Sequence, residues 1–300
     1  TLPAILYPLM RHNERLLYSA MFKQAWSSLK TLGADPTYLG ARTGMMAVLH
    51  TWGQQLQYHP HIHALVPAGG LSFEGKSWCK PKHKKFLVPV RALSRLFRGR
   101  LVAAIRAAYR SGELQLPAQQ QELRLVLDQA MRKEWVVYAK APFAGPHKLL
   151  DYLGRYVKRV AISNDRLLSC ENGRVRFTYR DYTDGDRKKV LQLTVQAFIH
   201  RFLQHVLPPR FCKLRYYDIL VIRNRQKRLE LCHRLLQSTY QQAQKMEWRA
   251  LLLQLSGQDP LQCTDCGEGQ LVIVDYFSAK RYQRGPPLHQ SVAASQHLNQ

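Results

Sequence analysis

The sequence is poor in acidic residues. Only 20 of its 300 residues are Asp or Glu, against 45 Lys and Arg, so the formal net charge is +25. An excess of this size disfavours cationic partners and favours a polyanion, of which nucleic acid is the commonest. The alternative is a generally basic surface that has no specific partner. We therefore expect nucleic acid as the partner rather than a small-molecule substrate.

Long apolar runs and clustered cysteines are also missing. No run approaches the roughly 18 apolar residues that span a bilayer, and no basic-then-apolar leader opens the sequence at Thr1. The six cysteines are scattered, and Cys263 and Cys266 are the one close pair. This usage argues against a disulfide framework. We expect a cytoplasmic protein that has no membrane partner.

Hydrophobic periodicity predicts an α+β fold, with an antiparallel sheet flanked by helices and a mixed, helix-rich C-terminal region. Strands 44–54 and 61–71 are predicted to form a β-hairpin through a polar connection at 54–60. The other predicted elements are helix 4–31, basic helix 90–114, strand 134–140, a helix starting at Pro146, strands 174–182 and 188–195, and helices 196–206 and 226–255.

Histidines alternate with other residues in "YHPHIHALV", residues 58–66, which otherwise has the pattern of a strand. Side chains two positions apart on a strand point to the same face. Two neutral imidazoles on one face, those of His61 and His63, are natural ligands for a divalent ion when an adjacent element supplies a third group. The alternative is a pair of histidines satisfied by ordinary hydrogen bonds. His59 is expected in the turn, because Pro60 would interrupt a ladder.

Two tyrosines share one face of the helix that starts at Pro146. Tyr152 and Tyr156 are the only pair among the 15 tyrosines separated by four residues. Arg155, Lys158 and Arg159 lie beside them and are predicted to contact DNA. A tyrosine hydroxyl near cations and a metal can attack a phosphodiester and hold the DNA end as a phosphotyrosine. The alternative for the tyrosines is aromatic packing against the apolar stripe of the same helix.

Several longer motifs resemble the two-tyrosine HUH transposases of bacterial rolling-circle insertion sequences, and the resemblance covers most of residues 1–265. The motifs are "TLP" at 1–3, "LHTWGQQLQYHPHIHALVPAGG" at 49–70, "WVVYAKAPFAGP" at 135–146, "YLGRYVKRVAISNDRL" at 152–167, "FTYRDYTDGDRKK", "FIHRFLQHVLP" and "KLRYYDIL".

The resemblance implies a role for each matching residue. His61 and His63 correspond to the histidine–hydrophobic–histidine motif that binds Mg or Mn in this family. Tyr152 and Tyr156 correspond to its nucleophile pair. Related replication initiators have a carboxylate about seven residues before the first histidine. Gln54 occupies that place here and is the predicted third ligand, with His50 as its rival.

The resemblance also implies a domain plan and an activity. Residues 1–168 are expected to form an HUH single-strand endonuclease domain with a core like the RNA-recognition motif. Residues 169–265 would be an α/β DNA-binding extension, and residues 266–300 a flexible tail. The expected activity is a metal-dependent transposase that nicks and rejoins single-stranded DNA at transposon ends through a 5′-phosphotyrosine. One alternative is a plasmid relaxase or replication initiator with the same chemistry.

The other alternative is a non-catalytic DNA-binding remnant, because the family usually carries a Cys-rich zinc segment before "TLP". Cys263 and Cys266 could contribute to a structural zinc site, but a lone C-x-x-C supplies only two of four ligands. The alternative is a pair of free thiols.

The basic stretches 90–114 and 223–249 are candidate DNA-contact faces. Arg215, Tyr216 and Tyr217 could stack on bases or be buried.

Overall fold

The computed structural model describes residues 1–83, 86–118, 122–140, 142, 149, 161–240, 247–263 and 266–272. The chain divides into two units, Thr1–Tyr240 and Gln241–Gln300, which are described separately. No helix in the described ranges is long and apolar enough to span a membrane.

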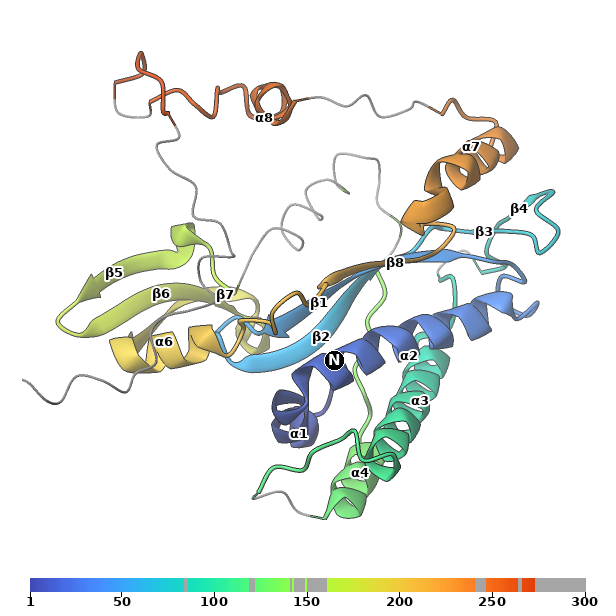
Figure 1. The fold of residues 1–300 in the computed structure, drawn as a ribbon, viewed down its shortest axis with the longest axis horizontal. Coiled ribbons are helices and arrows are strands. Elements are labelled where there is room, and N and C mark those ends of the chain that lie inside the picture. Colours follow the sequence, from blue (N-terminus) through green and yellow to red (C-terminus); the bar gives the residue numbers. More distant parts are fainter. Residues whose placement is uncertain are drawn as a thin grey trace, which may run out of the picture. The chain divides into compact units, whose positions relative to one another are not determined.

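The first unit contains helices and short antiparallel strands, which confirms the α+β prediction (Figure 1). Its helices are α1 (Tyr7–His12), α2 (Glu14–Ala34), α3 (Val90–Arg110), α4 (Leu123–Arg132), α6 (Val195–Leu203) and α7 (Arg225–Leu235). Its strands are β1 (Gly44–Trp52), β2 (Tyr58–Leu65), β3 (Gly70–Leu71), β4 (Trp78–Cys79), β5 (Leu167–Glu171), β6 (Arg174–Asp181), β7 (Arg187–Thr194) and β8 (Leu214–Asp218). The second unit has α8 (Trp248–Ser256).

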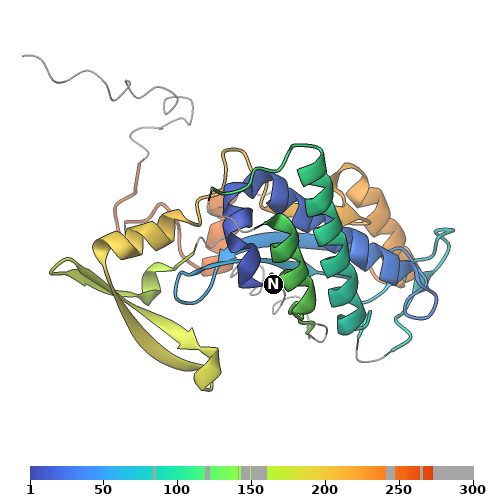
Figure 2. The same cartoon turned by 90° about the horizontal axis from the view of Figure 1, so that it is seen from below.

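The central sheet has the strand order β2-β1-β8, and both pairs are antiparallel. Figures 1 and 2 show α2, α3 and α4 gathered on one side of this sheet. Met45, Ala47 and Leu49 of β1 point to that side and join the main core. The alternate side chains of β1, including His50, therefore point to the opposite face. β8 comes from the region predicted as a separate extension, yet it lies in the same sheet as β1.

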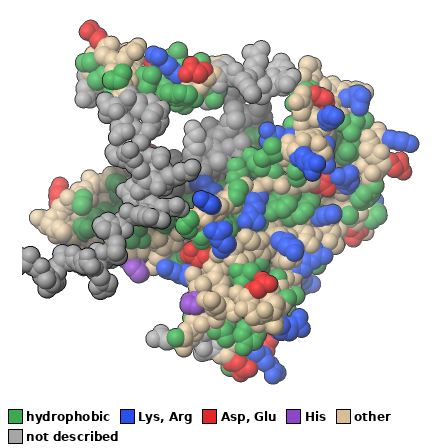
Figure 3. Space-filling model, in the orientation of Figure 1, with side chains coloured by type: hydrophobic (Ala, Val, Ile, Leu, Met, Phe, Trp, Pro, Cys, Tyr) green, Lys and Arg blue, Asp and Glu red, His purple; other side chains and the backbone are tan. Residues whose placement is uncertain are grey.

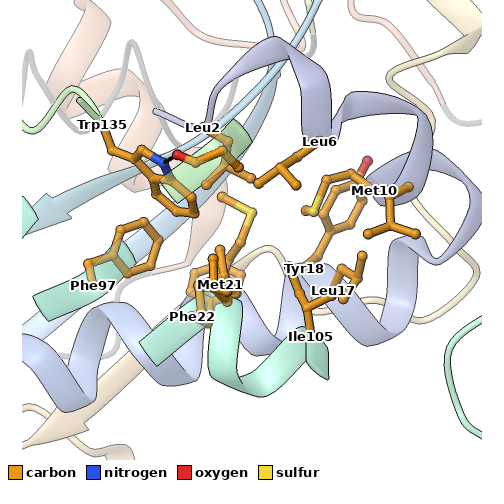
Figure 4. Packing of buried hydrophobic residues seen from close by; sticks show 14 of the residues in the cluster. Leu2, Leu6, Met10, Leu17, Tyr18, Met21, Phe22, Phe97, Ile105 and Trp135 are labelled. Atoms are coloured by element: carbon orange, nitrogen blue, oxygen red, sulfur yellow. Dashed lines mark hydrogen bonds between the residues drawn. The ribbon is translucent and has the colours of Figure 1, made fainter. Parts of the chain in front are cut away.

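The main core is built from the N-terminal helices, α3 and α4 (Figure 4). Tyr18 and Phe22 of α2 are fully buried there. Trp135 packs edge-on against Phe97 with ring centroids 5.6 Å apart, and its Nε1 donates a 2.9 Å hydrogen bond to the Ala130 carbonyl. The apolar face of the basic helix α3 is thus used for the core. Its arginines at 91, 95, 106 and 110 are exposed, whereas Arg100 donates to Ser27 and Thr31 of α2.

A second antiparallel sheet has the order β5-β6-β7, and α6 packs against it around Phe177. The turn between β6 and β7 contains Gly185 and Asp186, both with positive φ (62° and 60°). This turn lies in the sequence "DGD", between the strands predicted at 174–182 and 188–195. Strands β4, β5 and β8 were not predicted.

The predicted N-terminal helix is interrupted. Asn13 separates α1 from α2, and its side chain is buried. Its Nδ2 donates to the carbonyls of Leu9 (3.1 Å) and Gln115 (2.7 Å), while its Oδ1 accepts from the Gln115 amide (2.8 Å). These side-chain bonds add to the backbone bonds of Asn13, whose amide donates to the Leu9 carbonyl at 3.2 Å and whose carbonyl accepts from the Leu17 amide at 2.9 Å. They tie the break to Gln115, a contact far along the chain that periodicity alone could not reveal.

The predicted strand 134–140 was wrong. The segment has no strand assignment. Trp135 is buried, whereas Val136 and Tyr138 are 65% and 77% exposed. The Trp135 carbonyl accepts from Ser94 Oγ at 2.6 Å rather than from a strand. The pattern that suggested a strand therefore comes from one buried side chain, that of Trp135, in an irregular segment.

The single helix predicted over 226–255 was also wrong. α7 ends at Leu235, and Gln237 adopts a positive φ of 52°. His233 Nδ1 and Ser238 Oγ form a 2.9 Å hydrogen bond across this end. The second helical part is α8, which belongs to the other unit. The local backbone bonds after Leu235 outweigh the apolar periodicity.

Candidate metal centre

Three histidines lie together on the face of the central sheet opposite the helices. His50 of β1 is paired directly with His61 of β2, and His63 lies two residues farther along β2. One ring nitrogen from each lies within 4.8 Å of the others. His61 Nε2 and His63 Nε2 are 3.1 Å apart. The predicted pair is therefore brought together with His50, which was the alternative third ligand.

A β-bulge shapes the strand just before these histidines. His50 pairs with His61 and Trp52 pairs with Tyr58, so His59 and Pro60 lie opposite the single residue Thr51. Proline has no N–H to donate, and an irregular position of this kind tolerates that loss. The expectation that His59 lies in the turn was therefore wrong, because β2 already begins at Tyr58.

The bulge also orients His61. His61 Nδ1 lies 2.6 Å from the His59 carbonyl oxygen. A carbonyl only accepts, so Nδ1 carries the proton and Nε2 of the neutral ring presents a lone pair toward His63. His59 Nδ1 is in turn hydrogen-bonded to Tyr7 Oη at 2.8 Å. Tyr7 and His59 thus support the cluster from outside, a role that the sequence pattern did not indicate.

Burial keeps the imidazoles of His61 and His63 neutral. It lowers the pKa of His61 well below the ordinary value, and the neighbouring His63 lowers it further. Burial, with a smaller contribution from His50, lowers the pKa of His63 to about 3. His50 itself is 4% exposed and stacks on Trp52 with ring centroids 4.3 Å apart. Neutral imidazoles that converge on one point are the form of histidine that binds metals, so the donor set fits a divalent ion.

The other predicted ligand, Gln54, lies in the β1–β2 loop and points elsewhere. Its Nε2 donates to Tyr182 Oη at 3.1 Å, and its Oε1 accepts from the Arg180 amide at 3.4 Å. Both partners belong to the region of the second sheet. The structure does not bring the Gln54 side chain to the histidine cluster.

The β1–β2 loop is held to the second sheet through three consecutive carbonyls. Arg166 donates to the Gln54 carbonyl, Arg201 donates to the Gln55 carbonyl at 2.9 Å, and His205 Nε2 donates to the Leu56 carbonyl at 3.1 Å. The Leu56 side chain is fully buried in the cluster around Phe177. The second sheet and α6 therefore fix the hairpin that carries the histidines.

The remaining predicted site residues fall into two groups. Tyr152, Tyr156, Arg155, Lys158 and Arg159 lie outside the described residues. Cys263 and Cys266 are described in the second unit, where the Gly269 amide donates to Cys266 Sγ at 3.2 Å. These two thiols do not belong to any group of three or more metal-binding side chains within the described ranges. Among the described residues, the further ligands that a zinc site would need are not brought to these thiols.

The all-imidazole donor set predicts a metal preference. Imidazole suits transition metals better than Mg²⁺, and affinity rises from Mn²⁺ through Co²⁺ to Ni²⁺. In calorimetric titrations of the metal-free chain we expect Ni²⁺ and Co²⁺ to bind more tightly than Mn²⁺, and Mg²⁺ to bind most weakly. A His63→Ala variant should lose the site. Mg²⁺ binding tighter than Mn²⁺ would contradict an all-histidine centre.

Comparison with known proteins assigns the chain to a family. A family model described as "Putative transposase" (Y2_Tnp) matches residues 44–228. The chain is 43% identical over 300 residues to "Putative transposase y4qJ" of Sinorhizobium fredii, covering 96% of this chain and 74% of that protein. It is 29% identical over 283 residues to "Transposase for insertion sequence element IS801" of Pseudomonas savastanoi pv. phaseolicola, covering 89% and 64%. No solved structure matches it. The matched region contains the histidine hairpin, and the chain belongs to this Y2_Tnp transposase family.

Proposed function

We propose that this chain nicks and rejoins single-stranded DNA through a covalent 5′-phosphotyrosine, as the transposase of an insertion sequence. The observation that carries the proposal is the convergent group of His50, His61 and His63. Three imidazoles that converge on one point, with His50 buried and His61 and His63 partly buried, match the ligand set that divalent ions use in proteins.

The three imidazoles would hold the ion through one nitrogen each, with His61 Nε2 oriented by the bond from its Nδ1 to the His59 carbonyl. A bound divalent ion supplies Lewis-acid polarisation of the scissile phosphate. The protein's own task here is to keep His61 and His63 neutral and to hold all three rings in place. The bulge and the anchored β1–β2 loop perform the fixing, and burial maintains the neutral state.

Tyr152 or Tyr156 would act as the nucleophile. The tyrosine Oη forms a bond to phosphorus, the bond from phosphorus to the 3′-oxygen breaks, and the proton lost by the tyrosine balances the one gained by the released 3′-hydroxyl. Attack of a 3′-hydroxyl on the phosphotyrosine reverses the step and joins two strands. The second tyrosine allows another transfer before the first end is released, and no nucleotide triphosphate is required.

Single-stranded DNA at the ends of a mobile element is the proposed substrate. One relative is named as the transposase of an insertion sequence element. The net charge of +25 supports a polyanionic partner. Figure 3 shows Lys and Arg side chains spread over the visible face of the first unit, with fewer acidic ones. Arg155, Lys158 and Arg159 would neutralise phosphates next to the tyrosines.

The direct test is formation of a covalent adduct. The chain is incubated with a labelled single-stranded oligonucleotide from the ends of its own element, with Mn²⁺, and analysed on a denaturing gel. We expect a protein–DNA band that disappears in the Tyr152→Phe/Tyr156→Phe double variant and in the presence of EDTA. Each single variant should show which tyrosine makes the first attack.

Two results separate the alternatives. Binding of the oligonucleotide without any adduct, under every divalent ion tried, would contradict the enzymatic proposal and support a DNA-binding remnant. Adduct formation on a plasmid origin in preference to element ends would support a relaxase or replication initiator with the same chemistry.

A further inference from the structure

The edge strand β8 carries an aromatic side chain on the face that bears the histidines. Tyr216 pairs with Met46, and Leu214 pairs with Val48, which in turn pairs with His63 on the other side of β1. Residues opposite each other in neighbouring strands point to the same face. Leu214 and Tyr216 therefore lie on the same side of the sheet as His63. With strands about 4.8 Å apart, Leu214 lies two strands, or about 10 Å, from that histidine.

The neighbours of Tyr216 point the other way and are already engaged. Tyr217 stacks on Trp26 of α2, with ring centroids 5.3 Å apart and planes inclined by 20°. The Arg215 guanidinium lies 4.5 Å from the ring centroid of Phe22 and donates to Ser19 Oγ at 3.1 Å. Of the three residues singled out in "KLRYYDIL", these two belong to the helix side. Tyr216 is half-buried and belongs to neither apolar cluster of the described residues.

The surroundings of Tyr216 are cationic and partly apolar. The Arg225 guanidinium lies 5.8 Å from the Tyr216 ring centroid. Leu214, Tyr216, Ile222 and Arg223 line one shallow hollow at the edge strand β8, together with Arg215 and Tyr217 from the other face, and Ile222 is 66% exposed. Asp218, an acidic residue of β8 on the Tyr216 face, is paired with Arg42 at 2.7 Å. The hollow therefore combines the Tyr216 ring and an apolar side chain with Arg223, and Arg225 lies beside that ring.

We propose that Tyr216, with Arg223 and Arg225, forms a base-stacking platform for the single strand that enters the histidine centre. The inference rests on the proposed function for its substrate. Single-stranded DNA fits this surface because stacking on an aromatic ring needs an unpaired base, and arginines beside the ring meet the phosphates. The platform would hold the strand on the same sheet face as the metal ligands and so fix its path toward them.

The test is a binding measurement that does not depend on cleavage. The complete 300-residue chain is titrated, in EDTA, into a fluorescein-labelled single-stranded oligonucleotide that contains one 2-aminopurine, at several salt concentrations. We expect Tyr216→Ala to weaken binding by about 5-fold to 100-fold. It should also reduce the 2-aminopurine quenching caused by stacking, while the salt dependence stays unchanged. Tyr216→Phe should retain affinity and quenching. Arg225→Ala should reduce the slope of log affinity against log salt by about one.

Phe73→Ala is the matched control. Phe73 is 60% exposed between β3 and β4, outside both candidate DNA-contact stretches, so it is an exposed aromatic side chain on a different part of the chain. It should bind like the unchanged chain, and thermal unfolding should show that all variants are folded. Unchanged affinity and quenching in Tyr216→Ala, or equal losses in Tyr216→Ala and Phe73→Ala, would overturn the platform. Failure of the unchanged chain to form an adduct with Mn²⁺ would instead overturn the proposed function and leave this binding result standing.

Discussion

Replacing His50 with alanine should reduce adduct formation by about 1,000-fold. A metal ion that polarises a phosphate supplies several kcal/mol of transition-state stabilisation, and each 1.4 kcal/mol corresponds to a factor of ten in rate. A ring nitrogen of His50 lies within 4.8 Å of those of His61 and His63, so its removal would take one of three candidate ligands. The measurement is the initial rate of adduct formation at fixed Mn²⁺, together with Mn²⁺ affinity from calorimetry.

Gln54→Ala is the control for this prediction. The Gln54 side chain is bonded to Tyr182 and Arg180 rather than to the cluster, so the variant should keep its Mn²⁺ affinity. Because His50 also stacks on Trp52, His50→Asn serves as a second variant that retains polarity and part of the volume. If Gln54→Ala lost the metal and His50→Ala kept it, the third ligand would be Gln54 and the present assignment would be wrong.

Replacing Leu56 with alanine should lower the free energy of unfolding by about 2–4 kcal/mol. The side chain is fully buried in the cluster with Phe177, Val175 and Ala161, and Leu→Ala changes at such sites cost about 2–5 kcal/mol. Leu56 also has a φ of 59°, a conformation that leucine adopts only when the surrounding structure imposes it. Without its side chain the loop loses that anchor, so Mn²⁺ affinity should fall as well. Chemical denaturation and metal titration measure the two effects.

Leu168→Ala is the matched control because Leu168 is 51% exposed on β5 of the same sheet. Its stability should change by no more than about 0.5 kcal/mol. Equal stability of Leu56→Ala and Leu168→Ala would show that the β1–β2 loop is not held by the second sheet. Loss of stability in Leu56→Ala with unchanged Mn²⁺ affinity would show that the anchor does not position the histidines.

The fold was predictable where local pattern and tertiary environment agree. Strand β1, helix α3 and the β6–β7 hairpin have strong periodicity and clear turn residues, and they were located within a few residues. The strand predicted at 61–71 was located less well, because β2 spans Tyr58–Leu65. The break at Asn13 and the anchor at Trp135 depend on contacts with residues far along the chain. Strand β8 is short and forms by pairing with β1. The local sequence pattern of β8 does not predict this pairing.

The candidate site was also predictable only where the local pattern of one strand is enough. The alternation of His61 and His63 identifies two ligands that share a face. Choosing between His50 and Gln54 requires the register of β1 against β2, and this register depends on the bulge at His59 and Pro60. The bulge also places the His59 carbonyl against His61 Nδ1. A spacing rule in one strand cannot supply such a relation between two strands.

The most direct test of the account is to locate the phosphotyrosine. Trypsin separates the two candidates, because it cuts after Lys148, Arg155 and Lys158 and yields LLDYLGR and YVK. After reaction with single-stranded DNA and Mn²⁺, followed by nuclease trimming, mass spectrometry should find a nucleotide 5′-phosphate on Tyr152 or Tyr156. A covalent adduct on any other residue, or no adduct from a chain that binds both DNA and Mn²⁺, would contradict the proposed mechanism.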